Sequence, residues 1–395
     1  MRIYADNAAT TKMSAAATEA FIKYSEECFG NPSSLHSDGQ RAKEAVEGAR
    51  ATVARCINAS PREIYFTSGG SEADNQAIIT AAAIGKKAGK RHIVSDAIEH
   101  HAVLHTLKKL EIEGFDVTYL PVGEDGIVKA SDVEAAIKDD TCLVTVMYAN
   151  NEIGTLQPVR GIGEICRRRG VLFHTDAVQA AGHIPIDVEA DCIDMLSASA
   201  HKFHGPKGVG FLYAKNGVRL TNLIEGGAQE RGKRAGTENV PGIAAAAVAL
   251  EEAVKGMAEI AARLVPLRDR LTEKLLGIPH SALNGDAVRR LPSNVNFCFE
   301  GIEGESLLLL LDDRGISASS GSACTSGSLD PSHVLLAIGR AHDVAHGSLR
   351  LSLGDDATEE QVDFIADTVK DTVGYLRGFS PVWRDLCEGK TKFIL

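Results

Sequence analysis

The sequence predicts an α/β protein with a mostly parallel sheet in a large domain, followed by a smaller α+β domain. Between residues 64 and 213, strand-like runs alternate with helical runs, which is the pattern of crossover units in a parallel sheet. A long helical region follows over residues 243–276. Beyond it, residues 294–300 alternate between apolar and polar side chains, which predicts a strand of a second, smaller sheet.

Length and composition fit this division. The chain has 395 residues, of which 44% are apolar, and this is enough to bury two cores. We expect the large domain to span residues 15–255. The small domain is expected to combine residues 1–14 with residues 256–395.

Charge and cysteine content narrow the class of function. The net charge of −11 argues against nucleic acid or an anionic membrane as the main partner. The sequence has no apolar run of membrane-spanning length and no signal-peptide pattern, so we expect a cytoplasmic protein. The eight cysteines form no C-x-x-C pair, which excludes the common zinc motifs and indicates free thiols. No metal site is expected.

Several helices are predicted by spacing and by capping motifs. One helix is indicated by side chains that fall on a single face, namely Ala42, Val46, Ala49, Val53 and Cys56. Ser131-x-x-Glu134 and Thr358-x-x-Gln361 both match the capping box that opens helices. The second box leads into an apolar face made of Val362, Ile365, Val369 and Val373.

A glycine turn follows the first predicted strand of the large sheet. The strand beginning at residue 64 runs into Gly69 and Gly70, then Ser71, then a helix predicted over residues 73–83. Glycines expose backbone N–H groups, the helix N-terminus adds positive potential, and Ser71 adds a hydroxyl, so the segment can bind an anion. An ordinary strand-turn-helix corner is the alternative. A Walker A loop is excluded because the Lys-Ser/Thr ending is missing.

An aspartate follows another predicted strand, at residues 171–174. Asp176 falls at the carboxyl end of this strand, the edge at which open α/β sheets bind ligands. A carboxylate there can keep the ring nitrogen of pyridoxal phosphate protonated, and Gln179 could donate to the phenolic oxygen of the ring. The alternative interpretation of Asp176 is a helix cap.

The most informative segment spans residues 197–210. A buried strand at residues 193–196 breaks into small polar residues, then His201 and Lys202, then a glycine loop. A lysine in such surroundings suits a Schiff base with an aldehyde cofactor. A solvated turn lysine is the alternative, and Lys207 is the next candidate for the role.

A last segment, residues 319–328, consists mostly of Ser, Gly and Thr and contains Cys324. Such a composition packs poorly, so we expect an exposed, mobile loop with a reactive cysteine.

These four segments, in this order, resemble those of the class V pyridoxal-phosphate enzymes, and within them the NifS/IscS-type cysteine desulfurases. The resemblance extends over nearly the whole chain. It includes residues 4–11, 30–34, 99–104, 150–154, 230–239 and 348–354. The Ser-Ser-Gly-Ser-Ala-Cys-Thr-Ser run around Cys324 marks the first subgroup of that family.

The resemblance implies a pyridoxal-phosphate-dependent transferase fold of type I, a homodimer, and conversion of L-cysteine to L-alanine. Lys202 would bind the cofactor and take the Cα proton, and Cys324 would receive the sulfur as a persulfide. Arg350 would bind the substrate carboxylate with help from Asn151. The other residues implied in cofactor binding are Gly70, Ser71, His100, Asn151, Asp176, Gln179, Ser199, His201 and Thr237. His100 would stack on the ring and move protons, and Thr237 would reach the phosphate of the neighbouring subunit.

Alternatives remain at this point. Residues 227–233 match most of a Walker A motif, but Arg234 replaces the metal-binding hydroxyl residue, and the resemblance places this loop at a dimer interface. A selenocysteine lyase or a class V aminotransferase would share Lys202 and Asp176 without needing Cys324. A persulfide carrier would need only Cys324. The sulfur acceptor could be an iron–sulfur scaffold or a tRNA-thiolation protein.

Overall fold

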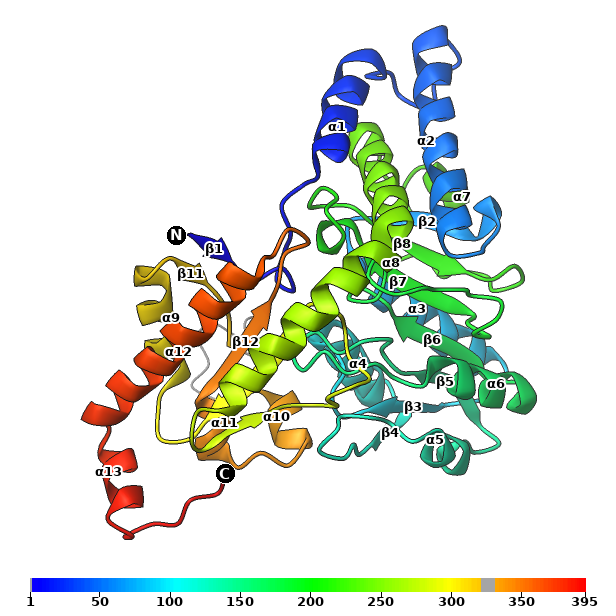
Figure 1. The fold of residues 1–395 in the computed structure, drawn as a ribbon. Coiled ribbons are helices and arrows are strands. Elements are labelled where there is room, and N and C mark those ends of the chain that lie inside the picture. Colours follow the sequence, from blue (N-terminus) through cyan, green and yellow to red (C-terminus); the bar gives the residue numbers. More distant parts are fainter. Residues whose placement is uncertain (1, 321–330) are drawn as a thin grey trace.

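Figure 1 shows the fold of the computed structural model, which describes residues 2–320 and 331–395. Its centre is a seven-stranded sheet. In spatial order the strands are β2 (Ile64–Thr67), β8 (Gly210–Ala214), β7 (Met195–Ser199), β6 (Leu172–Asp176), β5 (Thr141–Thr145), β3 (His92–Asp96) and β4 (Asp116–Leu120). Only β8 runs antiparallel to its neighbours, so the predicted mostly parallel sheet is confirmed.

Helices connect these strands and cover the sheet. The connecting helices are α3 (Gly70–Lys87), α4 (His101–Ile112), α5 (Ala130–Ala136) and α6 (Val159–Arg169). Short 3-10 turns lie at η1 (Pro61–Glu63) and η2 (Ala200–Lys202). Every residue of β3, β5, β7 and β8 is buried, as expected of a sheet covered on both faces.

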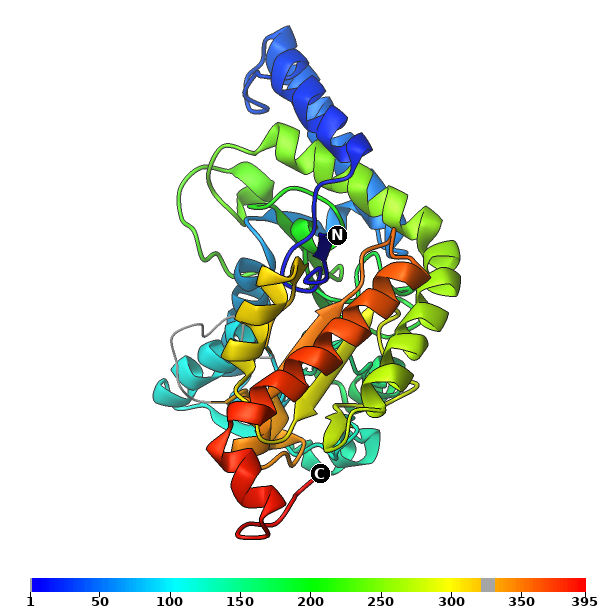
Figure 2. The ribbon, with the colours of Figure 1, turned by 60° about the vertical axis from the view of Figure 1, so that its left-hand side comes forward.

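A helical layer formed by the N-terminal part of the chain packs on α8 (Val240–Leu276), the long helix that crosses the molecule in Figure 1. Its members are α1 (Ala15–Glu27) and α2 (Ser37–Cys56), which project together from the body of the molecule (Figures 1 and 2). The predicted face of α2 is confirmed, because Ala42, Val46, Ala49 and Val53 are buried. The short α7 (Gln229–Gly232) precedes α8.

A second, antiparallel sheet packs against the far half of α8 and has its own core. Its strands are β12 (Ser348–Ser352), β10 (Asn294–Phe299) and β9 (Ser281–Leu283). β1 (Ile3–Tyr4) pairs with β11 (Ile316–Ser317). The helices here are α9 (Gly304–Asp313), α10 (His333–Ala337), α11 (His342–His346), α12 (Glu359–Phe379) and α13 (Pro381–Cys387). The predicted boundary at residue 255 stays a prediction, since α8 continues through it.

One of the two predicted capping boxes forms. At α12, Thr358 Oγ1 accepts from the Gln361 N–H and the Gln361 side chain accepts from the Thr358 N–H. The box at Ser131 was wrong, because α5 begins one residue earlier and Lys129 is its N-cap. The Ser131 hydroxyl donates instead to the neighbouring Asp132 carboxylate.

Two further expectations concern the glycine turn and membranes. The helix after the turn is longer than predicted, since α3 begins at Gly70 itself. Across the described part of the chain, no helix combines the length and the apolar character needed to cross a membrane.

Candidate active site

Four parallel strands end at one edge of the large sheet, and each delivers a predicted site residue there. β6 ends at Asp176, and β7 leads through η2 to Lys202. β3 is followed by His100, the N-cap of α4, and β5 by the turn that contains Asn151. Because the carboxyl ends of parallel strands share an edge, segments far apart in sequence meet at one site.

Lys202 lies under the N-terminal segment of the chain. Its Nζ donates to the carbonyl oxygens of Ala8 and Ala9, at 2.6 and 2.8 Å. The positive charge of Lys202 contributes to lowering the pKa of two neighbouring groups, Asp176 and His100. The three side chains therefore form one electrostatic unit.

Asp176 is buried at the end of β6. Its Oδ1 accepts from the Val178 N–H at 2.9 Å. Burial raises the pKa of Asp176 to about 6, while the Val178 N–H and Lys202 act in the opposite direction. A cationic hydrogen-bond donor at this carboxylate, such as a protonated ring nitrogen, would favour its ionised form.

His100 is neutral in this environment. Burial, followed by the charge of Lys202, lowers its pKa to about 4. Its Nδ1 accepts from the Ala102 N–H at 3.1 Å, so the single proton of the neutral ring is on Nε2. His100, Asp74 and Asp176 each present an atom within 4.8 Å of the other two.

Asp74 is a member of this site that the sequence analysis missed. It lies fully buried in α3, and burial, followed by the charge of Asp176, raises its pKa well above the usual value. Ser197 hydrogen-bonds to its carboxyl group, and His174 Nε2 lies 3.6 Å from its Oδ1. His174 also contacts Thr145 Oγ1 at 2.8 Å. One sequence signal could have identified Asp74. It is an aspartate among the small residues of a helix that follows a glycine turn.

The glycine turn forms a tight cradle beside these groups. A Cβ added at Gly70 would lie 2.4 Å from Val178 Cγ2 and 3.6 Å from Ser199 Cβ. A Cβ at Gly210 would lie 2.7 Å from the Cα of Gly69. No side chain caps the N-terminus of α3, so the N–H groups around Gly70 and Ser71 face this cradle without a capping acceptor. These features fit the phosphate of pyridoxal phosphate.

An ion pair ties a distant loop to the same turn. Glu72 accepts from the Ser68 N–H at 2.8 Å and from Arg234 Nε at 2.9 Å. Burial opposes ionisation, but these contacts prevail and lower the pKa of Glu72. Thr237, three residues beyond Arg234, is exposed and lines a pocket of about 60 Å³ with Thr67 and Ser68. Within one chain, Thr237 is not among the groups around Lys202.

Arg350 is buried in β12 beside the turn that contains Asn151. Its Nη1 donates to the Asn151 carbonyl oxygen at 2.9 Å, and its Nη2 donates to Asp6 Oδ1 at 2.9 Å. Its Nε is buried and has no partner among the described residues. The backbone of Ser319 pairs with that of Arg350.

Two predicted cofactor residues contact the N-terminal segment of the chain. Gln179 Nε2 donates to the Ala8 carbonyl oxygen at 2.9 Å. His201 Nδ1 lies 3.1 Å from Thr10 Oγ1, and burial, followed by Lys202, lowers the pKa of His201 to about 4. The prediction for Cys324 lies outside the described residues.

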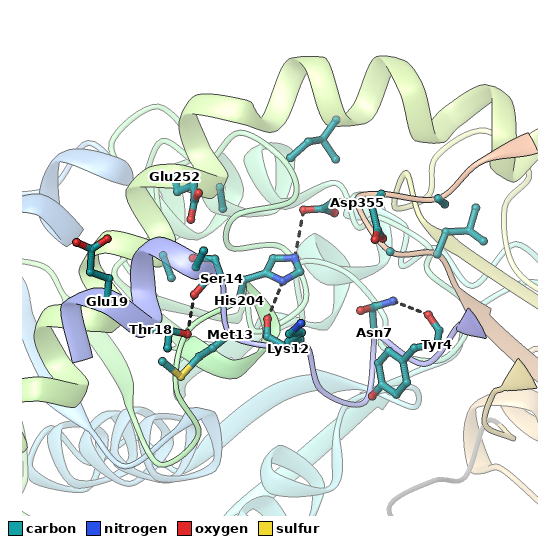
Figure 3. Close-up of a pocket in the computed structure, with 18 of the residues that line it drawn as sticks. Tyr4, Asn7, Lys12, Met13, Ser14, Thr18, Glu19, His204, Glu252 and Asp355 are labelled. Atoms are coloured by element: carbon teal, nitrogen blue, oxygen red, sulfur yellow. Dashed lines mark hydrogen bonds and ion pairs between the residues drawn. The ribbon is translucent and has the colours of Figure 1, made fainter. Parts of the chain in front are cut away.

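A pocket of about 1230 Å³ lies elsewhere, between α1, α8 and residues 353–357. Figure 3 shows His204 at its centre, where Nδ1 donates to the Lys12 carbonyl oxygen and Nε2 lies 3.1 Å from Asp355 Oδ2. Of the predicted site residues that the structure describes, none lines this pocket.

Comparisons with known proteins agree over nearly the full chain. Residues 3–365 match the family described as aminotransferase class-V. A protein named cysteine desulfurase IscS from Clostridium botulinum strain Hall is 54% identical over 392 residues, which is 98% of each chain. A solved structure titled NifS-like protein has 41% identity and a TM-score of 0.89, covering 95% of this chain and 100% of its own. Another, titled SspA in complex with cysteine, has 37% identity and a TM-score of 0.78, covering 89% and 98%.

These similarities confirm the predicted fold class, the pyridoxal-phosphate-dependent transferase fold of type I with a large, mostly parallel sheet.

Proposed function

The chain belongs to the class-V aminotransferase family and, within it, to the IscS- and NifS-type cysteine desulfurases, and on this basis we propose how it acts. It converts L-cysteine to L-alanine and transfers the sulfur to Cys324 as a persulfide. An acceptor protein, either an iron–sulfur scaffold or a tRNA-thiolation protein, then takes the sulfur. The observation that carries this proposal is the convergence of Lys202, Asp176 and His100 beside the uncapped N-terminus of α3.

The family depends on pyridoxal phosphate, and the site has groups suited to each part of it. The cradle at Gly70, Ser71 and Ser199 would hold the phosphate. Asp176 would hold the ring nitrogen, and Gln179 would face the phenolic oxygen. When bound, the cofactor supplies an electron-accepting ring that makes the Cα proton of an amino acid acidic.

The protein's own groups bind the substrate and move its protons. Arg350, whose Nε is free among the described residues, would bind the substrate carboxylate together with Asn151. Lys202 Nζ would take the Cα proton and return a proton to the product. His100 carries its proton on Nε2 and stays neutral, so it can donate a hydrogen bond without adding charge.

Sulfur transfer balances without an external oxidant. The Cys324 thiolate attacks the substrate sulfur, an S–S bond forms, and the C–S bond of the substrate breaks. The electron pair of that bond stays on the substrate carbon, which takes a proton and completes L-alanine. The substrate carbon is reduced and the sulfur is oxidised to the persulfide level.

The rival activities are distinguished by their products. Holoenzyme should form L-alanine and, in the presence of a reducing thiol, an equal amount of sulfide from L-cysteine. A class V aminotransferase would need a keto acid for turnover and would release no sulfide. A selenocysteine lyase would act on selenocysteine and leave L-cysteine unchanged.

We also propose a homodimer in which Thr237 completes the phosphate site of the neighbouring subunit. The projecting tip between α1 and α2 supports this, because Phe29 is 75% and Leu35 is 94% exposed there. Large apolar side chains gathered on a projection favour burial against another protein surface. We retain the domain division at residue 255 and a cytoplasmic location as parts of the same proposal.

A further inference from the structure

A cluster of histidine rings leads from the active site to the surface. The ring of His101 lies 6.4 Å from that of His100, 5.0 Å from that of His105 and 4.7 Å from that of His333, measured between centroids. His101 and His105 are four residues apart in α4, so they project from the same face of the helix. His333 begins α10, which is far from α4 in the sequence.

The protonation of His333 follows from its hydrogen bond. Its Nε2 lies 3.0 Å from the Glu99 carbonyl oxygen. Because a carbonyl oxygen only accepts, Nε2 carries the proton and Nδ1 carries a lone pair. A backbone carbonyl that orients one ring nitrogen in this way is the usual arrangement behind a metal-binding histidine.

The other two rings of the cluster are those of His101 and His105. Among the residues that the structure describes, neither the His101 ring nor the His105 ring has a hydrogen-bond partner. His105 is exposed, which opens the cluster to solvent and leaves its ring free to turn.

We propose that His101, His105 and His333 bind one divalent transition metal ion of the zinc class, with water in the remaining position. Imidazole nitrogen is a preferred ligand of Zn²⁺, and three histidines with an open position are a known arrangement. In the structure the ring nitrogens of these three residues do not all lie within 4.8 Å of one another, so the proposal requires the exposed His105 ring to turn toward His333. His100 stays with the cofactor, and the ion links α4 to α10. The partial positive charge at the N-terminus of α4 opposes a cation, so this charge weakens binding of the ion.

Calorimetric titration of the holoenzyme with zinc chloride tests the site. Wild-type protein should show one zinc-binding event per chain that His105→Gln weakens by at least about tenfold. His342→Gln is the matched control, because His342 and His346 also lie four residues apart with rings at 4.7 Å, in α11. This control should leave the binding event unchanged. Cofactor absorbance and melting temperature, measured on each variant, establish that it is folded and loaded.

X-ray absorption of the protein with one equivalent of zinc identifies the ligands. The proposal requires nitrogen ligands at about 2.0–2.1 Å and no sulfur at about 2.3 Å. Sulfur in the coordination shell would assign the zinc to cysteines and overturn the proposal. Equal zinc affinity in wild type and His105→Gln would also overturn it. Neither readout depends on turnover of L-cysteine, so each outcome is separate from that of the proposed function.

Discussion

At the scale of single residues, Lys202 supplies the amine that is proposed to bind the cofactor and take the Cα proton, and no other side chain in the site replaces it. Lys202→Ala should lose the visible absorbance of the bound cofactor and lower alanine formation by at least about 100-fold, because the variant has no amine to take the Cα proton. Absorbance spectra and alanine assays measure the two effects separately.

Lys207 gives the matched control, since it is exposed and lies five residues away. Lys207→Ala should keep both the absorbance and the activity. If Lys202→Ala keeps them and Lys207→Ala loses them, the roles assigned to the two lysines must be exchanged.

Asp96 offers a second prediction, because it is a buried acid at the end of β3. Burial raises its pKa from the usual 3.8 to about 7, and Oδ2 has no partner among the described residues. The stability that neutral Asp96 contributes is therefore present below pH 3.8 and lost as the pH rises through about 7. Asp96→Asn keeps the acceptor for the Ile98 N–H and should stabilise the protein above pH 7 by about 1–3 kcal/mol.

Urea unfolding at several pH values measures this difference. The gain should disappear toward pH 4. A variant that is less stable than wild type at pH 8 would mean that the Asp96 carboxylate has a favourable charged partner.

Sequence reasoning finds residues whose position in a pattern is unusual and misses those defined by neighbours in space. Asp176 ends a buried strand and Lys202 follows one, so both could be identified from the sequence. Asp74 lies within a helix and meets Asp176 and Ser197 only because α3 crosses the ends of β6 and β7. The sequence shows an aspartate among the small residues of this helix, but no local pattern places that aspartate beside Asp176 and Ser197.

For single elements, the capping box of α12 gives a direct test. Thr358→Ala removes the acceptor for the Gln361 N–H and should cost about 1 kcal/mol of unfolding free energy. Ser131→Ala is the control, because Ser131 caps no helix and should cost less than about 0.5 kcal/mol. Equal losses in the two variants would show that capping is not what Thr358 contributes.

His204 links the turn after β7 to the loop after β12. Its contact with Asp355 raises the pKa of His204 above the usual 6.5. The stability contributed by the charged ring is therefore present below that value and is lost as the pH rises through the raised pKa. His204→Gln should lose up to about 1 kcal/mol at pH 6 and much less at pH 9, since the pair is partly exposed.

Comparing the two pH values cancels any backbone strain at His204, whose φ is 63°. A loss that is the same at both values would mean that the contact with Asp355 is not ionic.

The first residue of a helix was predictable where the capping motif in the sequence lies at the N-cap that the structure shows. Thr358 lies at the true N-cap, and the predicted box forms. At α5 the same motif fails, because the helix begins before Ser131 and the motif is displaced by two residues from the N-cap. A short helix such as α5 has too few apolar residues for their spacing to show where the helix begins.

At the scale of the whole molecule, the proposed dimer predicts which exposed apolar residues become buried. Leu35→Asp should convert the dimer to monomer and reduce activity, because Thr237 of the other subunit would no longer reach the phosphate cradle. Light scattering measures the mass, and Ile112→Asp is the control, since Ile112 is 89% exposed on α4 away from the tip. A fully active wild-type monomer at working concentration would contradict the proposal.

The large, mostly parallel sheet was predictable because its strands and helices alternate along the chain. The position of Thr237 was not, because its expected contact lies in another subunit, and within one chain it is exposed. The same limit applies to residues 227–233, whose likeness to a Walker A motif has no counterpart in the fold: Glu230 there forms a buried ion pair with Arg50.

The central claim is that this site takes sulfur from L-cysteine and delivers it to Cys324. The most direct test is mass spectrometry of the holoenzyme after one turnover with L-cysteine, with alanine measured in the same sample. The peptide that contains Cys324 should gain one sulfur atom, with about one alanine per modified chain. Cys324→Ser should still bind the cofactor and respond to cysteine, but should form no persulfide and little alanine. Alanine and sulfide formed at a normal rate by Cys324→Ser, or sulfur found on another cysteine, would contradict the account.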